Sequence, residues 1–260
     1  MIFGRWTNLC QPNVCCRTSK SQYPLMKKQL FTLASAMLFS VAAFAQTAEE
    51  IINKHIAAVG GQEAIRAFKS AKFTQSTIAP GQSIDATATV IFDKASRIDM
   101  SMMGNDILVV TKGDAGWVKQ GTAAPRDLPA EQLKVIMASI TLPGLELVNA
   151  SAKGDKIEFK GKEVVDGQPM LVVSANVQGS PATLYLDPDT YLIAARKGSV
   201  QAMGQTVEAS IAYDDYRKAG NLTLPYRAKT EAMGQAATVK LTALEVNPTI
   251  DESIFEKPKQ

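Results

Sequence analysis

The sequence has little cysteine and histidine, and both shortages limit the chemistry open to it. The three cysteines, Cys10, Cys15 and Cys16, lie near the start of a 260-residue chain, and His55 is its one histidine. Beyond residue 45 there is no thiol nucleophile, no disulfide framework and no zinc site of the usual His/Cys kind. A Ser-His-Asp triad would need His55, but the G-x-S-x-G motif that presents such a serine is absent. We therefore expect a protein that is not an enzyme and has no catalytic residue, metal ion or cofactor.

An excess of one charge is also lacking once the first 45 residues are set aside. These residues carry five basic side chains and no acidic one: Arg5, Arg17, Lys20, Lys27 and Lys28. From totals of 28 basic and 25 acidic residues, the remaining chain keeps 23 and 25, a net charge of −2. This balance excludes a surface that binds nucleic acid through bulk positive charge. The glycine motifs of phosphate-binding loops are missing too, so no nucleotide site is expected.

Residues 26–45 have the pattern of a secretory signal peptide. Lys27 and Lys28 follow Met26, residues 30–44 are mostly apolar, and Ala43 and Ala45 precede Gln46. An apolar run of about 15 residues is shorter than the roughly 20 that span a membrane. We expect export to the periplasm. Residues 1–25 are interpreted as an extension from a start codon chosen too early; the alternative is a genuine cysteine-bearing segment.

Residues 46–260 predict a single domain of mainly antiparallel strands with a few helices. Thr47 and Glu50 have capping-box spacing at the start of a helix that ends near Gly60-Gly61, and residues 62–69 continue as a shorter helix. The only other expected helix covers residues 129–140 and ends at Pro143-Gly144. Alternating apolar and polar residues predict eleven strands, and His55 is expected to be structural or solvent-facing. The strands cover residues 84–92, 98–103, 106–112, 116–120, 156–165, 170–177, 182–186, 191–200, 207–216, 222–232 and 237–246.

Soft apolar side chains remain as the candidate functional residues. Methionine adapts to irregular apolar ligands because its chain is unbranched and its sulfur polarizable, although core packing would explain each one as well. We expect helix residues to face strand residues across a cavity, and a one-residue slip would exchange Met102 for Met103 and Leu108 for Val109. The candidate cavity-lining residues are Met100, Met102, Leu108, Val110, Trp117, Leu133, Ile136, Met137 and Ile140.

Four segments together resemble the LolA/LolB-like outer-membrane lipoprotein-sorting proteins. Three are an opening helix with Gly-Gly, a strand–glycine turn–strand unit with Trp117, and a D-P-x-T hairpin; the fourth is a closing N-P-x-x-D-x-x-x-F tail. They cover residues 48–61, 107–118, 184–196 and 213–255. The resemblance implies an unclosed antiparallel β-barrel of about eleven strands, wrapped around amphipathic helices, whose apolar cavity holds acyl chains.

The resemblance further implies a monomeric periplasmic carrier or binder of lipid or lipoprotein acyl chains in lipoprotein sorting or envelope lipid transport. Transport proteins of the inner and outer membranes would be its partners. The sequence departs from the family in one respect. In the LolA carriers an arginine directly before a proline holds the helical lid closed, but the comparable residues 93–97 read Asp-Lys-Ala-Ser-Arg here and the Arg-Pro pair is absent. For this reason neither Lys94 nor Arg97 is assigned as the residue that holds the lid closed. The alternative function is a periplasmic sensor or structural module that binds protein on the same scaffold.

The first prediction concerns processing. We expect the exported protein to begin at Gln46, because Ala43 and Ala45 place the small side chains that signal peptidase requires at −3 and −1. N-terminal sequencing of the exported chain measures this directly. Finding residues 1–25 on that chain would contradict both the cleavage site and the choice of Met26 as initiator.

Overall fold

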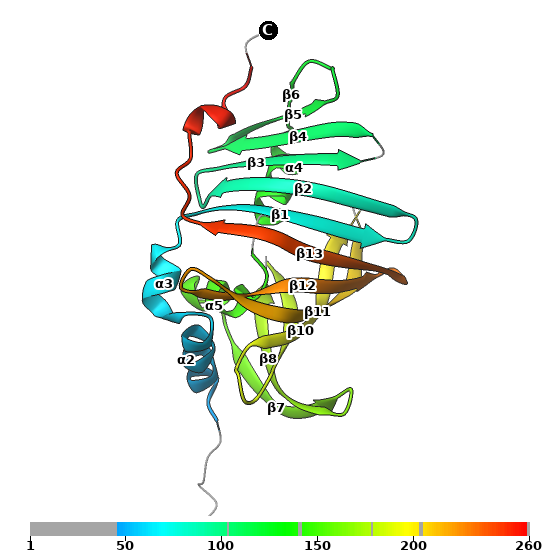
Figure 1. Ribbon diagram of the computed structural model, residues 1–260. Helices are drawn as coiled ribbons and strands as arrows, with labels where there is room; N and C mark the ends of the chain where they lie inside the picture. The colour runs from blue at the N-terminus through cyan, green and yellow to red at the C-terminus, as the bar shows by residue number, and fades with distance from the viewer. Residues whose placement is uncertain (1–45, 103, 140–141, 178, 203–204, 259–260) are drawn as a thin grey trace, which may run out of the picture. The chain divides into compact units, whose positions relative to one another are not determined.

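The computed structural model describes residues 46–258 apart from 103, 140–141, 178 and 203–204. Its strands form one antiparallel sheet in the order β6-β5-β4-β3-β2-β1-β13-β12-β11-β10-β9-β8-β7 (Figure 1). The bounds are β1 Ser70–Ala79, β2 Gln82–Ile91, β3 Ala95–Met102, β4 Asn105–Lys112, β5 Ala115–Gln120, β6 Arg126–Asp127, β7 Glu158–Val165, β8 Gln168–Val177, β9 Ser180–Leu186, β10 Ile193–Ala202, β11 Gln205–Ala219, β12 Leu222–Ala232 and β13 Gln235–Val246.

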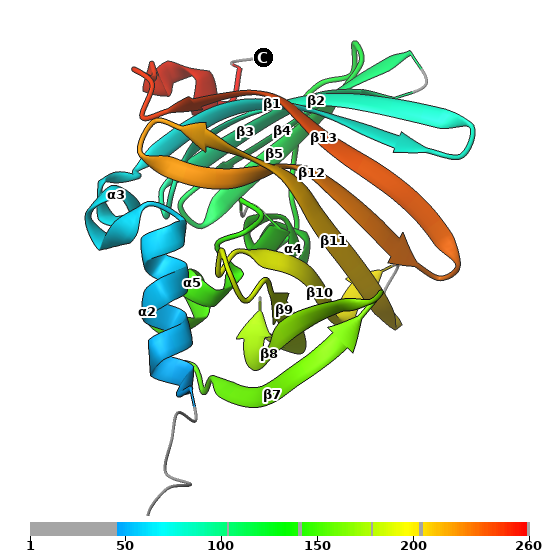
Figure 2. The same ribbon diagram turned by 60° about the horizontal axis from the view of Figure 1, so that its bottom comes forward.

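Within the described residues, four α-helices and one 3₁₀ helix accompany the sheet. Figure 2 shows α4 and α5 within the curve of the sheet, whereas η1 lies against its outer face near β3 and β4. The bounds are α2 Ala48–Ala58, α3 Gly61–Ala67, α4 Ala130–Ser139, α5 Glu146–Ala152 and η1 Glu252–Phe255.

The predicted fold class is confirmed: the protein is a long, curved antiparallel sheet that stays open, with helices on its concave side. The terminal strands β6 and β7 have one neighbour each among the described residues. The strands β1 and β6 were not predicted, since β1 is rich in half-buried polar residues and β6 has only two residues. The helix α5 was also missed, because Pro143-Gly144 indicates an end and only seven residues of helix follow it.

The first helix forms largely as its sequence predicts. The Thr47 hydroxyl accepts a hydrogen bond from the Glu50 amide at 3.1 Å, which satisfies one free donor of the first turn. The Glu50 carboxylate pairs with Lys54 one turn later instead of completing the capping box. The helix ends where Gly60 adopts φ +130°, a conformation that favours glycine.

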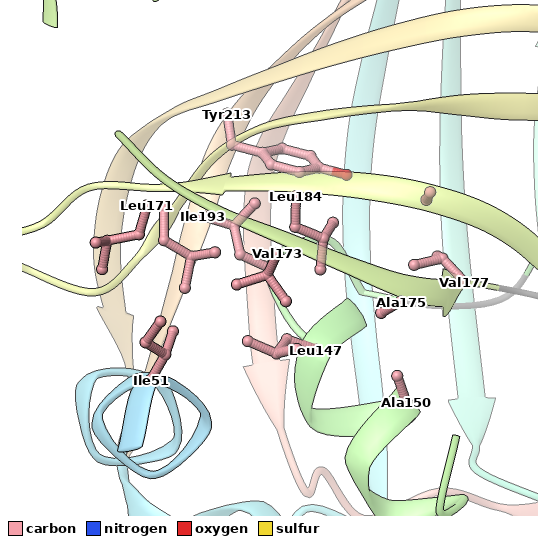
Figure 3. Close-up of a cluster of buried hydrophobic side chains, with 12 residues drawn as sticks. Ile51, Leu147, Ala150, Leu171, Val173, Ala175, Val177, Leu184, Ile193 and Tyr213 are labelled. Carbon is pink, nitrogen blue, oxygen red and sulfur yellow. The ribbon is translucent and has the colours of Figure 1, made fainter. Parts of the chain in front are cut away.

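The largest hydrophobic core lies between α2, α5 and strands β8 to β11. Ile51 of α2 and Leu147 of α5 point toward Val173, Leu184 and Ile193 of the strands (Figure 3). A second cluster joins the C-terminal end of α2 to the residues before α5 and to β12. A third lies on the outer face, where η1 covers part of β3, β4 and β5. The sheet is therefore packed on both faces at the β3–β5 region.

The sheet divides between β12 and β13, and we call this place the fork. Residues 227–232 of β12 pair with β13, but residues 222–226 pair only with β11, and residues 241–246 of β13 pair only with β1. Pro225 lies two residues from the last paired position and has no amide hydrogen to donate. Pro225 therefore lies at a local edge of the sheet, the kind of strand position that proline tolerates. A register shift in β13 next to Thr74 adds a bend on the other side.

The C-terminal end of α2 occupies the fork. The Val59 carbonyl accepts a hydrogen bond from the Thr223 amide at 2.9 Å, so helix backbone replaces the missing strand partner there. A Cβ at Gly60 would lie 2.2 Å from the Asn221 carbonyl oxygen, which leaves no room for any other residue.

The second prediction tests this contact. Gly60→Ala should lower the free energy of unfolding by about 3 kcal/mol or more, because it combines backbone strain with a clash against rigid backbone. Gly61→Ala is the matched control: Gly61 has φ +88° but nothing within 4 Å of its Cβ position, so only the strain remains, about 1–2 kcal/mol. Chemical denaturation measures both. Equal losses would mean that the contact with Asn221 is not tight.

Candidate functional site

The candidate site is a cavity of about 130 Å³ at the fork, on the concave side of the sheet. Its walls come from β1, β2, β3, β12 and β13 and from the segment that connects α4 to α5. The lining residues are mainly apolar. They are Phe73, Gln75, Ala86, Ala88, Ile98, Leu142, Pro143, Pro225, Tyr226, Arg227, Ala228, Val239 and Leu241.

The cavity exists because small side chains face inward where the strands separate. Ala88 pairs with Phe73 on one side and with Ile98 on the other, and Ala86 repeats the pattern two residues earlier. Ala228 faces the same space from β12. Alanine side chains fill little of this space. Because β12 and β13 do not pair at the fork, the strands also cannot close it. Two separate sequence signals could have located the site: the alternating Ala86 and Ala88 of β2, and Pro225 within the β12 strand.

The charged group at the cavity is neutralised. The Arg227 guanidinium donates to the Asp214 carboxylate across the β11–β12 pair, and this pairing raises the pKa of Arg227. The remaining polar lining groups are the Gln75 amide and the Tyr226 ring with its hydroxyl. The arrangement favours an apolar ligand over an anion.

The described residues among the candidates named from sequence do not line this cavity. Met100 comes nearest, because it pairs with Ala86 and shares the concave face. Met102 lies two residues further along β3 and is 37% exposed at the end of the strand. The alternative residue, Met103, lies outside the described residues.

For Leu108, Val110 and Trp117, the expected face is wrong. They lie on the outer face, where Val110 and Trp117 pack with Phe255 of η1, and Leu108 packs against that cluster. The concave face of β4 carries Val109 and Thr111 instead, since Thr111 pairs with Gly116, whose Cβ position would lie 2.9 Å from Leu133 of α4. The one-residue slip therefore occurs in β4. Because η1 covers the outer face of β4, both faces of this strand are buried. The alternation of apolar and polar residues therefore cannot show which face points to the concave side.

The helix residues also lie away from the cavity walls. Leu133 is buried against Gly116 and Leu128, Ile136 is half-buried, and Met137 is 42% exposed. Ile140 lies outside the described residues. Among the α4 side chains that are described, Leu133 is the one buried residue.

Lys94 and Arg97 bind the C-terminal segment and not the helices. Lys94 pairs with Glu252 at 2.5 Å, while Arg97 pairs with Asp99 and donates to the Ile254 carbonyl. Both therefore hold η1 on the outer face. A different arginine, Arg196, lies buried on the inward side of β10 and pairs in register with Leu184.

A buried acid at the start of α5 connects the helix to the sheet. Glu146 accepts a hydrogen bond from the Tyr213 hydroxyl at 2.5 Å, and its second oxygen, Oε2, has no described partner. Burial raises the pKa of Glu146, an effect that the Tyr213 hydrogen bond and the nearby Arg196 charge only partly oppose. Burial and the neighbouring carboxylate likewise raise the pKa of Tyr213.

His55 provides the matching link for α2. Its Nδ1 lies 2.8 Å from the Tyr191 carbonyl oxygen, its Nε2 has no described partner, and burial lowers its pKa. The structural role expected for this histidine is thus the one observed. Within the described ranges, no cluster of three His, Cys, Asp or Glu side chains could hold a metal ion. No helix among the described residues is long and apolar enough to cross a membrane.

Comparison with solved structures identifies the architecture. A LolA superfamily protein from Nitrosomonas europaea matches over 82% of this chain and 99% of its own, with a TM-score of 0.53 and 15% identity. A DUF1329 family protein from Desulfovibrio piger matches over 80% and 97%, with a TM-score of 0.54 and 12% identity. The chain has a LolA-like fold.

A third LolA-like match supports the same arrangement. It is a domain from Vibrio parahaemolyticus assigned to outer membrane lipoprotein sorting, which covers 81% of this chain and 97% of its own, with a TM-score of 0.50 and 11% identity. No family model matches the sequence, and no curated protein matches it either. At these identities the likeness concerns the fold and not the ligand.

The third prediction concerns Glu146 and pH. Because the folded protein holds this proton more tightly than the unfolded chain does, stability from this group should be full below the ordinary pKa of 4.5 and decline as pH rises above it. Glu146→Gln keeps an acceptor for Tyr213 and removes the titration. The wild type should therefore lose stability relative to the variant at up to about 1.4 kcal/mol per pH unit.

Thermal and chemical unfolding across pH measure this difference. Glu163→Gln, at an exposed position of β7, is the control for removing one negative charge. Unfolding curves for wild type and Glu146→Gln that stay parallel at every pH would show that Glu146 is not held protonated by the fold.

Proposed function

We propose that residues 46–260 form a periplasmic carrier that binds the acyl chains of a lipid or lipoprotein in the cavity at the fork. The observation that carries the proposal is the cavity itself: an apolar space enclosed between the concave face of an open sheet and the segment before α5. Moving acyl chains through water requires such shielding, since each exposed CH₂ favours return to a membrane by about 0.8 kcal/mol.

The observed cavity is smaller than a site that would hold a whole acyl chain. Pockets that hold drug-sized ligands have volumes of roughly 300–1,000 Å³, and a cavity of about 150 Å³ holds one benzene. At about 130 Å³, the cavity must enlarge to accept a long acyl chain. Leu142 and Pro143 cover it, and α4 precedes them with Leu133 as its buried described side chain. Displacement of this segment would extend the cavity along the concave face toward Met100.

The LolA-like fold supports a place in lipoprotein sorting or envelope lipid transport, as the assignment of the Vibrio parahaemolyticus domain illustrates. The signal peptide supports export, with cleavage before Gln46. The carrier would act without catalysis or cofactor, as a monomer, and exchange its cargo with transport proteins of the inner and outer membranes. Residues 1–25 would play no part in this function.

The fourth prediction fills the cavity. Ala88→Phe adds an aromatic ring that occupies most of the cavity. Binding of a fluorescent fatty acid should therefore weaken at least about tenfold, while the melting temperature of the protein should stay equal or rise. The matched control is Ala243→Phe, which adds the same ring at an exposed position of β13. Ala88→Leu provides a smaller filler if the phenylalanine overpacks the site.

Two results would contradict the assignment. The first is undiminished fatty-acid binding by a folded Ala88→Phe, and the second is an equal loss in Ala243→Phe. Native mass spectrometry of the protein purified from its host's envelope adds an independent measurement. Co-purified lipid or a lipoprotein adduct supports the carrier, whereas an empty protein bound to another chain supports the sensor or structural module.

A further inference from the structure

Three neighbouring hairpins end in exposed apolar side chains, and we call this set the rim. The rim consists of Met102 at the β3–β4 hairpin, Ile78 at the β1–β2 hairpin and Met233 at the β12–β13 hairpin. Their exposed fractions are 37%, 45% and 66%. The six strands involved are consecutive in the sheet, so the outer two tips are four strand spacings apart, roughly 19 Å. Figures 1 and 2 both show the three hairpin tips at the same end of the strands, on the right of each view.

The rim is also free of charged residues. Residues 73–84, 100–105 and 232–239 contain no Asp, Glu, Lys or Arg. The turns at the opposite end of the same strands do contain charges, such as Asp93-Lys94 between β2 and β3 and Asp114 between β4 and β5. The turns at the two ends of these strands therefore differ in chemistry, and the exposed apolar groups belong to the uncharged turns. Charged residues, including Asp85 and Asp106, lie one residue beyond these ranges.

Met233 occupies a position that folding alone does not favour. Met233 and Gly234 have φ of +55° and +72°, the signature of a two-residue hairpin turn in which Asn-Gly is preferred. A methionine there is strained and leaves its apolar side chain in water. The sequence Ala-Met-Gly-Gln of residues 232–235 also occurs at residues 202–205, between β10 and β11, although Met203 and Gly204 lie outside the described residues.

We propose that the rim docks on the surface of a lipid bilayer and inserts Ile78, Met102 and Met233 among the lipid headgroups. A protein partner needs a continuous surface of roughly 800 Å² per side, which separate tips flanked by Ser, Thr and Gln do not offer. A bilayer interface accepts isolated apolar side chains, and its affinity grows with the apolar area that they bury. The lack of charge selects hydrophobic insertion over attraction to anionic lipids.

The rim continues the strands that wall the cavity. Phe73 and Gln75 precede Ile78 on β1, and Val239 and Leu241 follow Met233 through β13. Docking would bring this end of the cavity walls to the source or destination of an acyl chain. This step rests on the proposed function, but the exposure and lack of charge at the tips do not.

The experiment uses the processed chain purified from its host's envelope, so that no signal peptide contributes. We expect it to cosediment with uncharged phosphatidylcholine vesicles equally at low and high salt. The variant Ile78→Thr, Met102→Gln and Met233→Asn should reduce the partition coefficient at least about tenfold. Val164→Thr is the control, because Val164 is 73% exposed but lies in the β7–β8 hairpin, outside the rim.

Met233→Asn alone keeps the test valid if the triple variant unfolds. Asparagine suits the turn, so this single change should preserve or raise the melting temperature while weakening vesicle binding about threefold. Fatty-acid binding in solution, measured without vesicles, should stay at the wild-type level in both variants. Lost vesicle binding with intact fatty-acid binding would thus support the rim independently of the cavity.

Several results would overturn the proposal. Wild type that ignores phosphatidylcholine vesicles, or binds only vesicles with anionic lipid and is released by salt, would exclude hydrophobic docking. Undiminished vesicle binding by the folded triple variant would show that another surface makes the contact. Self-association of the wild type that the variant abolishes, with no vesicle binding, would make the rim an interface between copies of this chain. In each case the fatty-acid measurement decides separately whether the carrier function stands.

Discussion

The loss of pairing between β12 and β13 is the constraint on which the rest of the structure depends. Pro225 cannot donate a backbone hydrogen bond, and from there β12 follows β11 while β13 follows β1. The diverging strands expose backbone and apolar surface that other elements must satisfy. The Val59 carbonyl takes the Thr223 amide, and Leu142 and Leu145 pack with Leu222 and Leu224. The cavity is the part of this space that remains unfilled, because alanines and not larger residues face it.

Two buried polar contacts decide which side of the site can move. His55 connects α2 to the backbone of Tyr191, and Glu146 connects the first turn of α5 to Tyr213. Leaving a buried polar group unpaired costs about 1–3 kcal/mol, so these contacts hold α2 against the turn between β9 and β10 and α5 against β11. The segment over the cavity is therefore fixed at its α5 end. At its other end the segment follows α4, whose Leu133 is buried against Gly116 of β5.

Period-two alternation predicted most of the sheet because long hairpins bury one face each, and Thr47 and Gly60 marked the first helix. Prediction failed where a second element changes burial. η1 covers the outer face of β4 and β5, so Leu108, Val110 and Trp117 are apolar for a reason unrelated to the concave side. The short α5 depends on tertiary contacts of Glu146 and Leu147, which no local pattern encodes. The cavity depends on loss of pairing within the β12–β13 hairpin and on small residues of β2 that face it, and in the sequence Pro225 alone hinted at the loss of pairing.

The two faces and two ends of the sheet are thus used differently. The outer face of β3 to β5 is closed by a C-terminal segment that Lys94 and Arg97 secure, and the turns at that end are charged. The concave face keeps the small residues and the cavity, and its strands run on to uncharged tips. Exposed Met233 in a strained turn destabilises the isolated protein, whereas Asn in the same place would not. A bilayer interface, the environment proposed for the rim, would take up this apolar side chain more favourably than water does. This asymmetry between the two ends of the sheet does not depend on the size of the cavity.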